Sequence, residues 1–424
     1  MYCWSFLTIV AGMLLVHQQQ VNGEEMEVDA TGETEMPRCP WAINAPTDLK
    51  RTRHTLSEYT VAGVNLATYG LEDDQKQEDK QEAEPYELYD SFDIGDLITG
   101  NEGWWQLLRY RQLLQRPDNC FYYDKVALKR WLPTIGIDTP RTFAIRYGSE
   151  LSTSGQVENE TKAIVSLFPT ETDFVAKPSH MSLTQGTCIV SYDTDRNVHL
   201  LSTKGTAVSE EEHFVPEESA ANLAKHLHLR AAEWESWTLQ NVKPGVVIEE
   251  RYTALHCYEC PPPEFKIFVI WGRMWIAQLD FVKGQDRWCG GNFHRNGTIM
   301  MKQDEEKGNP LDTWLDWVDF PRIVDMAERL GAHKDMLRVD IFAGVPAGVV
   351  KAGATKEEKL AEVQYVVSEF SFHPTTMFDD DEIIEEGARL WLAGYKMDNY
   401  RVVTNTEVPE EFIETGSLPP LETA

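Results

Sequence analysis

Two strand-like stretches near the C-terminal end decide the fold prediction: MLRVDIF at residues 336–342 and YVVSEFSFHP at residues 365–374. Each carries one acidic residue, Asp340 or Glu369, among apolar, β-branched and aromatic neighbours. An unpaired carboxylate in such surroundings is costly to desolvate, and a bound divalent cation removes that cost because hard cations take carboxylate oxygens. The two stretches therefore predict neighbouring strands whose carboxylates hold magnesium.

Three lysines far upstream supply the opposite charge. Lys125 and Lys129 lie in DKVALKRW, and Lys177 lies in DFVAKPSH. Lysines that hold phosphate and carboxylates that hold magnesium are the two halves of a nucleotide site. The prediction is spatial, because it requires these distant side chains to converge on one place.

Composition limits the class of protein. The chain has 424 residues, is 42% hydrophobic and carries a formal charge of −30. That length fits one large domain or two to three lobes, and the acidic surface excludes nucleic acid as a partner. The excess acid is concentrated in residues 23–35, 71–90 and 378–386, which we interpret as solvated tails and a solvated helix end.

The first 23 residues predict a signal peptide. Their apolar stretch from Trp4 to Val16 is too short to span a bilayer, and cleavage is expected before Glu24. A short signal anchor is the competing interpretation. The sequons that begin at Asn159 and Asn296 are typical of a glycoprotein. We therefore expect a protein of the Golgi or endoplasmic reticulum lumen, or a secreted one, without a transmembrane span once the signal is removed.

Six cysteines remain after the signal, and an even number allows three disulfides of open connectivity. They are Cys39, Cys120, Cys188, Cys257, Cys260 and Cys289. Cys257 and Cys260 form a CxxC in the Pro-rich stretch HCYECPPPE, without the second pair of ligands that a zinc site needs. They are predicted to staple a loop.

Periodicity divides the rest of the chain. Residues 24–95 read as an acidic, mostly disordered linker, in which residues 58–70 can add a strand. Asp124 is a plausible N-cap of a helix from Lys125 to Leu132 that Pro133 ends. Further helices are predicted at 209–237, 320–330 and 381–397, and residues 163–169 fit either helix or strand. Strands are predicted at 141–147, 173–179, 187–193, 197–203, 245–252, 264–272, 273–282, 336–342 and 365–372. This order of helices and antiparallel strands indicates an α+β protein.

Six segments resemble, in the same order, the ATP-grasp enzymes. They are DKVALKRWLPTIGIDTP (124–140), VAKPSHMSLTQGT (175–187), VVIEERY (246–252), EFKIFVIWGR (264–273), LRVDIF (337–342) and SEFSFHP (368–374). Within that superfamily EWESWTLQNVKPGVVIEERY (233–252) and RIVDMAERLG (322–331) resemble the TupA-like branch, which is associated with cell-surface polysaccharide biosynthesis.

The resemblance implies an ATP-grasp fold, in which two α+β lobes clamp a nucleotide. It implies a helical pre-grasp segment at 96–143, a first lobe at 144–243, a second lobe at 244–400 and a C-terminal tail at 401–424.

The resemblance also implies roles for individual residues. Lys129 and Lys177 would bind the α- and β-phosphates beneath a covering loop that contains Ser182, Thr184 and Gly186. Glu249 or Glu250 would face the adenine amino group or the ribose. Glu264 would bind ribose, and Lys266 matches a lysine of the TupA-like pattern, although an exposed pair at a sheet edge is the alternative for these two. Asp340 and Glu369 would hold magnesium, and Arg338 would stabilise charge on the moving phosphoryl group. His180 is expected to face water.

The sequence departs from the superfamily in two places. Ser371 stands where many ATP-grasp ligases have Asn, and Thr375 stands where a glycine often follows the proline. A one-metal site, a metal shell completed by water, or loss of activity would each follow from this.

The leading hypothesis is an ATP- and magnesium-dependent ligase that activates a carboxylate as an acyl-phosphate in surface polysaccharide or glycopeptide biosynthesis. Its partners would be ATP and a glycan- or amino-acid-type acceptor, and the oligomeric state stays open. A glycan or sugar kinase on the same fold is the nearest alternative. A non-catalytic nucleotide- or glycan-binding secreted protein and an acidic exported structural protein are the others.

Overall fold

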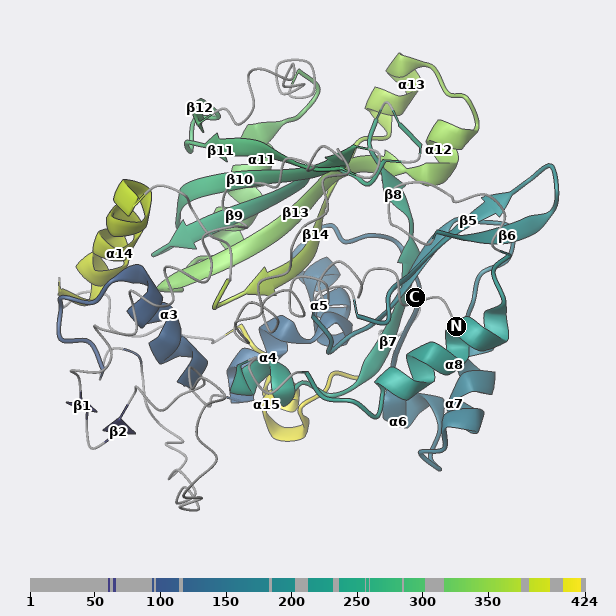
Figure 1. The fold of residues 1–424 in the computed structure, drawn as a ribbon, viewed down its shortest axis with the longest axis horizontal. Coiled ribbons are helices and arrows are strands. Elements are labelled where there is room, and N and C mark those ends of the chain that lie inside the picture. Colours follow the sequence, from purple (N-terminus) through teal and green to yellow (C-terminus); the bar gives the residue numbers. More distant parts are fainter. Residues whose placement is uncertain are drawn as a thin grey trace, which may run out of the picture.

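Two antiparallel sheets form the framework of the protein in the computed structural model (Figure 1). The structure describes the two-residue strands β1 (Thr60–Val61) and β2 (Val64–Asn65), and residues 94, 97–113, 117–182, 185–202, 213–231, 236–255, 257–258, 260–283, 286–301, 316–374, 381–396 and 407–420. The predicted signal peptide, most of the acidic linker, Cys39, Thr184 and Thr375 lie outside the described residues. The α+β class is confirmed by antiparallel sheets covered by helices.

The larger sheet has the strand order β12-β11-β10-β9-β13-β14, with β8 paired to β13. Its strands are β8 (Tyr252–Thr253), β9 (Glu264–Ile270), β10 (Arg273–Lys283), β11 (Asp286–Phe293), β12 (Ile299–Met301), β13 (Met336–Pro346) and β14 (Gln364–Ser371). Trp271 and Gly272 join β9 to β10 with φ values of 52° and 75°. Two positive φ values in a two-residue turn suit the twist of a hairpin.

Side-chain alternation gives this sheet two different faces. One face packs apolar residues such as Ile267, Val339 and Ile341 into the main core, which helix α11 (Phe320–Leu330) covers. At one end of the other face, Phe268 and Met336 pack under helices α3 (Trp104–Leu113) and α14 (Asp381–Lys396). The middle of that second face carries polar residues instead, including the two predicted metal ligands. The alternation therefore places the candidate site on one face of the sheet.

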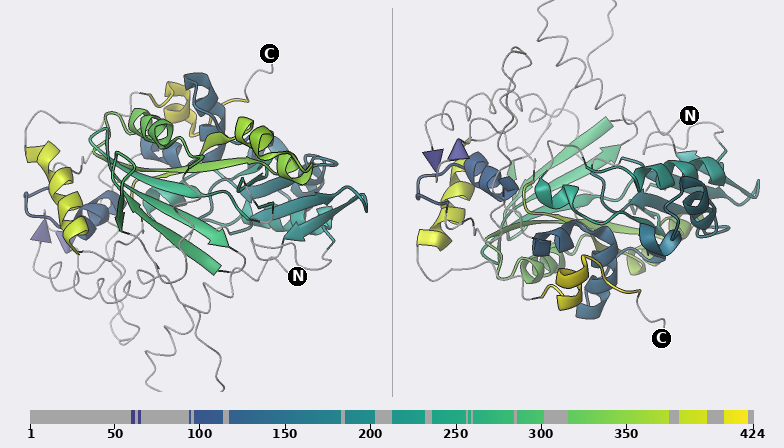
Figure 2. Two further views of the ribbon diagram at one scale, coloured as in Figure 1. Left: turned by 90° about the horizontal axis from the view of Figure 1, so that it is seen from above. Right: turned by 90° about the horizontal axis from the view of Figure 1, so that it is seen from below.

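The smaller sheet has the order β3-β7-β4-β5-β6. Its strands are β3 (Thr142–Tyr147), β4 (Phe174–Pro178), β5 (Cys188–Asp193), β6 (Val198–Ser202) and β7 (Gly245–Glu250). Helix α6 (Gly148–Leu151) follows β3, and α7 (Val157–Val165) and α8 (Pro216–His226) cover one face of the sheet (Figure 2). The expected lobe boundary at residue 244 does not follow this sheet, because β7 pairs with β3 and β4.

The structure resolves one ambiguous helix prediction and corrects another. The ambiguous stretch at 163–169 begins as the end of α7. The helix predicted over 209–237 is wrong in its extent, because described residues 213–215 are not helical and Pro216 starts α8, which gives way at the C-cap Leu227. Proline favours the first turn of a helix because its missing N–H has no partner to lose there. A separate short helix, α9, spans Trp237–Gln240.

Helices α4 (Pro117–Tyr123), α5 (Lys125–Trp131) and α15 (Glu410–Thr415) lie below the larger sheet and to the left of β7 in Figure 1. The segment expected to be a C-terminal tail therefore includes a docked helix. Phe412 is buried and packs edge-on against Phe121, with ring centroids 5.1 Å apart. The helical segment also does not end at Pro133, because the chain continues as the 3-10 helix η4 (Leu132–Ile135) and turns at Gly136 with φ 71°.

The remaining elements complete the connections. Helices α12 (Ala347–Lys351) and α13 (Lys356–Ala361) join β13 to β14. Cys257 and Cys260 form the predicted staple, but three disulfides are not made, because Cys120 is a buried thiol that donates to the Thr238 carbonyl. Among the described residues no helix is long and apolar enough to cross a membrane.

Candidate functional site

A buried carboxylate joins two of the predicted phosphate-binding lysines. Glu249 on β7 lies 2.9 Å from the Lys129 ammonium and 2.5 Å from the Lys177 ammonium. Lys129 comes from α5 and Lys177 from the adjacent strand β4, which pairs with β7. Lys129 is only 3% exposed, so it is not an ordinary surface lysine. The structure therefore brings the two lysines together at a fixed spacing.

Glu249 faces the two lysines, whereas Glu249 or Glu250 was expected to face the adenine amino group or the ribose. Burial alone would raise the pKa of Glu249, but Lys129 and Lys177 outweigh it and lower that pKa to about 2. Burial lowers the pKa of Lys129 to about 8, against the opposing pull of Glu249. Glu249 is therefore an ionised partner of the lysines, whereas the partly exposed Glu250 remains the hinge glutamate available to a ligand.

Lys125, predicted with the other lysines to hold phosphate, links the two sheets. Its ammonium donates to the carbonyl of Met181 at 3.1 Å and lies 4.0 Å from the Glu369 carboxylate. Asp124 fixes this position, because its side chain caps α5 by accepting from the amides of Val126 and Ala127. The signal in the sequence was the DK pair that opens the helix.

The two predicted metal ligands are cross-strand neighbours, since Asp340 on β13 pairs with Glu369 on β14. Arg338 donates two hydrogen bonds of 2.7 Å to the two oxygens of Asp340 and a longer one of 3.5 Å to Glu369. Asp340 is completely buried, whereas the Glu369 side chain is 43% exposed. The carboxylate open to a ligand is therefore Glu369.

Electrostatics distinguish the two carboxylates. Burial raises the pKa of Asp340 to about 8, and the neighbouring carboxylates of Glu264 and Glu369 act in the same direction against Arg338. The pKa of Glu369 is lowered, because Lys125, Arg338, Lys177 and Lys266 together outweigh burial. An added cation would stabilise the ionised form of Asp340, which burial penalises.

The donor set fits magnesium held jointly by protein and phosphate. No three His, Cys, Asp or Glu residues gather into a metal site in the part of the chain that the structure describes. Two carboxylates remain, and magnesium is usually bound by one or two carboxylates together with substrate phosphates. Glu369 would hold the ion directly, and Asp340 would join it only when Arg338 releases one oxygen.

Polar side chains continue across the larger sheet from this pair. Lys266 faces Asp340, and Gln278 faces Lys266, on successive strands β13, β9 and β10. The Lys266 ammonium lies 3.8 Å from the Glu264 carboxylate, and β9 is an internal strand. The alternative of an exposed pair at a sheet edge is therefore wrong for Glu264 and Lys266.

The expected phosphate-covering loop begins beside the lysines. Gly186 has φ 73°, and a Cβ there would come within 2.8 Å of Pro178 and 2.9 Å of His226. Ser182 is half-buried near the start of the loop. The expectation that His180 faces water is wrong, because its Nε2 lies 3.0 Å from the His226 carbonyl oxygen and 3.1 Å from that of Leu229. His180 instead fastens the loop to the end of α8.

Ser371, which stands where the resemblance led us to expect asparagine, lies opposite Arg338 in the sheet. Close by, the Tyr123 hydroxyl accepts from the Phe372 amide at 2.8 Å and bonds His373 Nδ1 at 2.7 Å. Burial lowers the pKa of His373 to about 3, so the ring is neutral at physiological pH. Tyr123 and His373 therefore fix the chain just after β14, and the sequence gave no signal for them.

Buried polar atoms without a hydrogen-bond partner gather around the same site. Of the eight such atoms among the described residues, four belong to residues of the site: Lys129 Nζ, His180 Nδ1, Glu249 Oε2 and Gln278 Oε1. Lys129 Nζ and Glu249 Oε2 are an ion pair whose geometry is not that of a hydrogen bond. Such groups are rare in native proteins and often mark a ligand or a functional site.

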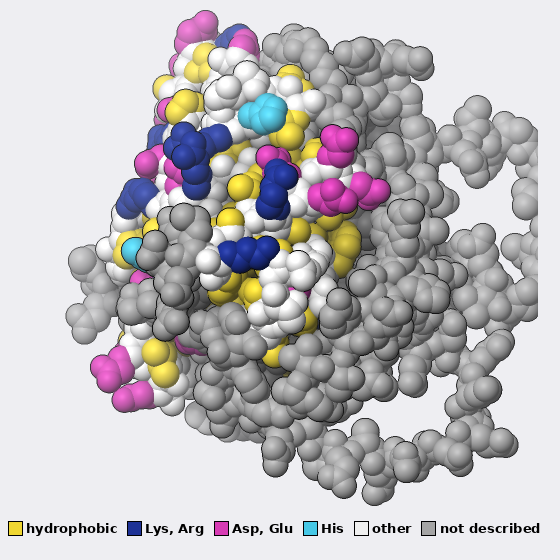
Figure 3. All heavy atoms as spheres, turned by 90° about the vertical axis from the view of Figure 1, so that its left-hand side faces the viewer, with side chains coloured by type: hydrophobic (Ala, Val, Ile, Leu, Met, Phe, Trp, Pro, Cys, Tyr) yellow, Lys and Arg dark blue, Asp and Glu magenta, His cyan; other side chains and the backbone are white. Residues whose placement is uncertain are grey.

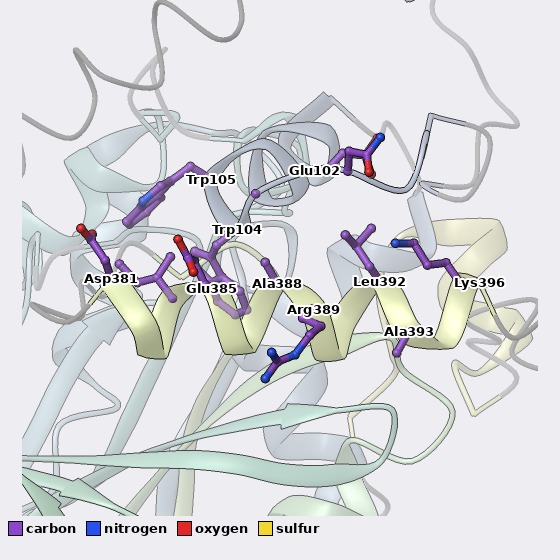
Figure 4. A pocket seen from close by; sticks show the side chains of 13 residues that line it. Glu102, Trp104, Trp105, Asp381, Glu385, Ala388, Arg389, Leu392, Ala393 and Lys396 are labelled. Atoms are coloured by element: carbon purple, nitrogen blue, oxygen red, sulfur yellow. The ribbon is translucent and has the colours of Figure 1, made fainter.

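A cavity of about 640 Å³ lies elsewhere, between α3 and α14. Figure 4 shows Trp105 and Glu102 on one side and Glu385, Leu392 and Lys396 of α14 on the other. On the surrounding face basic, acidic and apolar side chains are interspersed (Figure 3). The lining does not include the lysines and carboxylates of the candidate site, which are Lys125, Lys129, Lys177, Glu249, Asp340 and Glu369.

No protein-family profile and no curated protein matches the chain. Solved structures to which it is similar include the ATP-grasp ligase PsnB with a phosphomimetic variant of its minimal precursor, Mg and ADP. That match has 11% identity and a TM-score of 0.30, and covers 68% of this chain and 65% of that one. The Chryseobacterium gregarium RiPP-associated ATP-grasp ligase in complex with ADP and a leader and core peptide is 13% identical, with a TM-score of 0.27. That match covers 66% of this chain and 60% of that one. A bifunctional glutathione synthetase from Pasteurella multocida is 12% identical, with a TM-score of 0.24, and the match covers 61% of this chain and 33% of that one.

This chain thus spans just under two thirds of the PsnB chain. Similarity as weak as this carries no argument about activity. Any function therefore has to be argued from the chain's own site.

Proposed function

We propose that this protein is an ATP- and magnesium-dependent ligase of the ATP-grasp type. It would activate a carboxylate by phosphoryl transfer and then join it to an amine or hydroxyl. The carboxylate takes the γ-phosphoryl group and releases ADP, and the second nucleophile then displaces inorganic phosphate. The acceptor we favour is a uronic acid or an acidic amino acid of a surface glycan or glycopeptide, and the compartment is the secretory lumen or the cell exterior.

The observation that carries this proposal is the meeting of three lysines and two carboxylates from distant parts of the chain. Lys125 lies 4.0 Å from Glu369, and Lys129 and Lys177 share Glu249. A triphosphate needs compact cations, and lysine provides a point charge with three donors. Carboxylates beside those cations suit a metal that bridges phosphate oxygens.

The residues would act mainly by positioning and by neutralising charge. Lys177, whose side chain is 14% exposed, is the lysine of the pair best placed to meet a phosphate. Lys129, which is nearly inaccessible, would hold Glu249 and so keep Lys177 in place. Arg338 would turn from Asp340 toward the transferring group. A magnesium ion held by Glu369 would supply further positive charge to the phosphates.

Binding is the first test of the proposal. ADP with MgCl2 should raise the midpoint of thermal unfolding beyond the effect of MgCl2 alone, because a ligand bound only by the folded state stabilises it. Lys177→Met should remove most of that shift. Glu158→Gln changes an exposed carboxylate far from the site and should leave the shift unchanged. Absence of any shift in the wild type would refute every nucleotide-based function.

Product analysis is the second test. Incubation with ATP, MgCl2 and uronic acid or acidic amino acid acceptors should release ADP and phosphate together with a new amide or ester. Asp340→Asn and Glu369→Gln should abolish this turnover while Glu158→Gln retains it. ADP release with a phosphorylated sugar would instead identify a glycan kinase. Nucleotide binding without turnover would identify a binding protein, the function that Ser371 in place of asparagine would favour.

A further inference from the structure

Lys125 occupies a position that the roles of the other site residues do not explain. It opens α5, directly after the buried cap Asp124, whose second oxygen accepts from the Tyr147 hydroxyl at 2.9 Å. The helix start is therefore held from both sides, and the Lys125 side chain extends from a fixed base. Its side chain is 12% exposed.

The ammonium contacts two parts of the site at once. It donates to the carbonyls of Met181 at 3.1 Å and Ser179 at 3.5 Å, at the start of the segment that follows β4. Its remaining side lies 4.0 Å from Glu369, on the other sheet. Lysine has three donors, and this geometry directs them at two carbonyls and one carboxylate.

The two predicted metal ligands therefore each have a protein cation. Arg338 binds Asp340 with both of its donors on the same side, and Lys125 stands beside Glu369. A divalent cation that approached Glu369 would meet the Lys125 charge, while a phosphate at the same place would be attracted by it. The Lys125 charge therefore weakens the binding of a divalent cation and strengthens the binding of a phosphate.

We propose that Lys125 is a positioning residue that couples metal and nucleotide at this site. It holds the carbonyls of Ser179 and Met181 against Glu369, opposes a metal ion when no phosphate is present, and favours the metal–nucleotide complex when phosphate is present. This inference rests on the proposed nucleotide function and adds an ordered preference: nucleotide binds with the metal, rather than metal first.

Two ligands titrated separately test the coupling: Mn²⁺ alone, followed by electron paramagnetic resonance, and ADP with MgCl2, followed by calorimetry. Lys125→Met should bind Mn²⁺ about fivefold more tightly than the wild type. The substitution removes the repulsion between the lysine charge and the metal ion, which is roughly 1 kcal/mol. The same variant should bind ADP with MgCl2 at least about fivefold more weakly. Simple damage to the site would weaken both.

Lys125→Arg, which keeps the charge, should restore ADP binding to within about twofold and should leave Mn²⁺ binding near the wild-type value. Lys162→Met removes an exposed lysine that pairs with Glu158, and it serves as the matched control. If Lys125→Met weakens both ligands or changes neither, the coupling role is wrong. If the wild type binds neither Mn²⁺ nor ADP, the proposed function itself fails.

Discussion

At the residue scale, the site is built from charged groups whose burial is tolerated only because they meet. Glu249 and Lys129 are each 3% exposed, and neither would be stable as an isolated ion. Replacing such a pair by apolar residues can be neutral, but removing one partner is costly because the other charge is left behind. Two tests at single residues follow from this.

Glu249→Gln should destabilise the protein by about 3–5 kcal/mol at pH 7, because two ammonium groups then lack a counter-charge. The pKa of Lys129, about 8, lies below its unfolded value of 10.5, so the unfolded chain binds more protons between these values and stability rises with pH there. Without Glu249 the pKa of Lys129 in the folded protein should fall further, so the rise of stability with pH should begin at a lower pH. Urea unfolding between pH 6 and 9.5 should therefore show the variant regaining stability relative to wild type. A constant difference would contradict this.

His180→Gln tests the opposite end of the pH range. Burial lowers the pKa of His180 to about 4, below the ordinary value of 6.5. The unfolded state binds the proton more strongly, so stability falls as pH drops from 6.5 toward 4. Gln does not titrate but retains a donor for the carbonyls at the end of α8. Thermal melts across this range should show a shallower acid decline for the variant. An unchanged slope would place the acid sensitivity elsewhere.

At the element scale, close approach fixes how α14 sits on the larger sheet. A Cβ on Gly387 would come within 2.4 Å of the Trp275 ring, and one on Gly394 within 1.9 Å of Trp271. Both tryptophans belong to the β9–β10 hairpin. These two glycines therefore set the distance between the helix and the sheet, and helix propensity is sacrificed for packing.

Gly387→Ala should lower the free energy of unfolding by about 1–3 kcal/mol, because overpacking displaces a large ring. Gly348→Ala on α12 is the matched control, since nothing lies within 4 Å of its Cβ position. There the gain in helix propensity should stabilise slightly, by up to about 1 kcal/mol. Chemical denaturation of both variants gives the comparison. Equal effects would show that steric contact does not fix α14.

At the scale of the whole molecule, a small loop ties the two sheets together. The Cys257–Cys260 disulfide closes a loop that carries Tyr258. The Tyr258 hydroxyl donates to Asp173 at 2.7 Å, beside β4, and its carbonyl accepts from Arg251 at 3.0 Å. Arg251 also bonds Ser191 on β5 at 2.5 Å. The loop therefore holds the larger sheet against the smaller one.

Replacing both loop cysteines by serine should cost about 2 kcal/mol, the entropy expected for so short a closed loop. Tyr258→Phe should cost about 1 kcal/mol in the disulfide-bonded protein. The same change should cost clearly less in the serine variant, because the loop no longer presents the hydroxyl to Asp173. A double-mutant cycle by urea unfolding measures this difference. Strict additivity would show that the disulfide does not position Tyr258.

Patterns within a few residues were enough to predict the local structure and the chemical type of the site. The period-2 alternation of residues 336–342 and 365–372 predicted β13 and β14 and the shared face of Arg338 and Asp340, because successive side chains of a strand point to opposite sides. The Asp124 cap fixed the start of α5 in the same local way. The helix over 320–330 and the α+β class follow from patterns that act within a few residues.

Only the tertiary structure decided which side chains meet. A pattern shows the face on which Lys129, Lys177 or Glu249 lies, but not the element opposite it, since that depends on how the sheets and α5 pack. For this reason the burial of His180, the neutralisation of the lysines by Glu249 and the docking of Phe412 were not predictable. Each is a contact between residues far apart in the chain, formed because apolar faces fix the elements and their polar groups must then find partners.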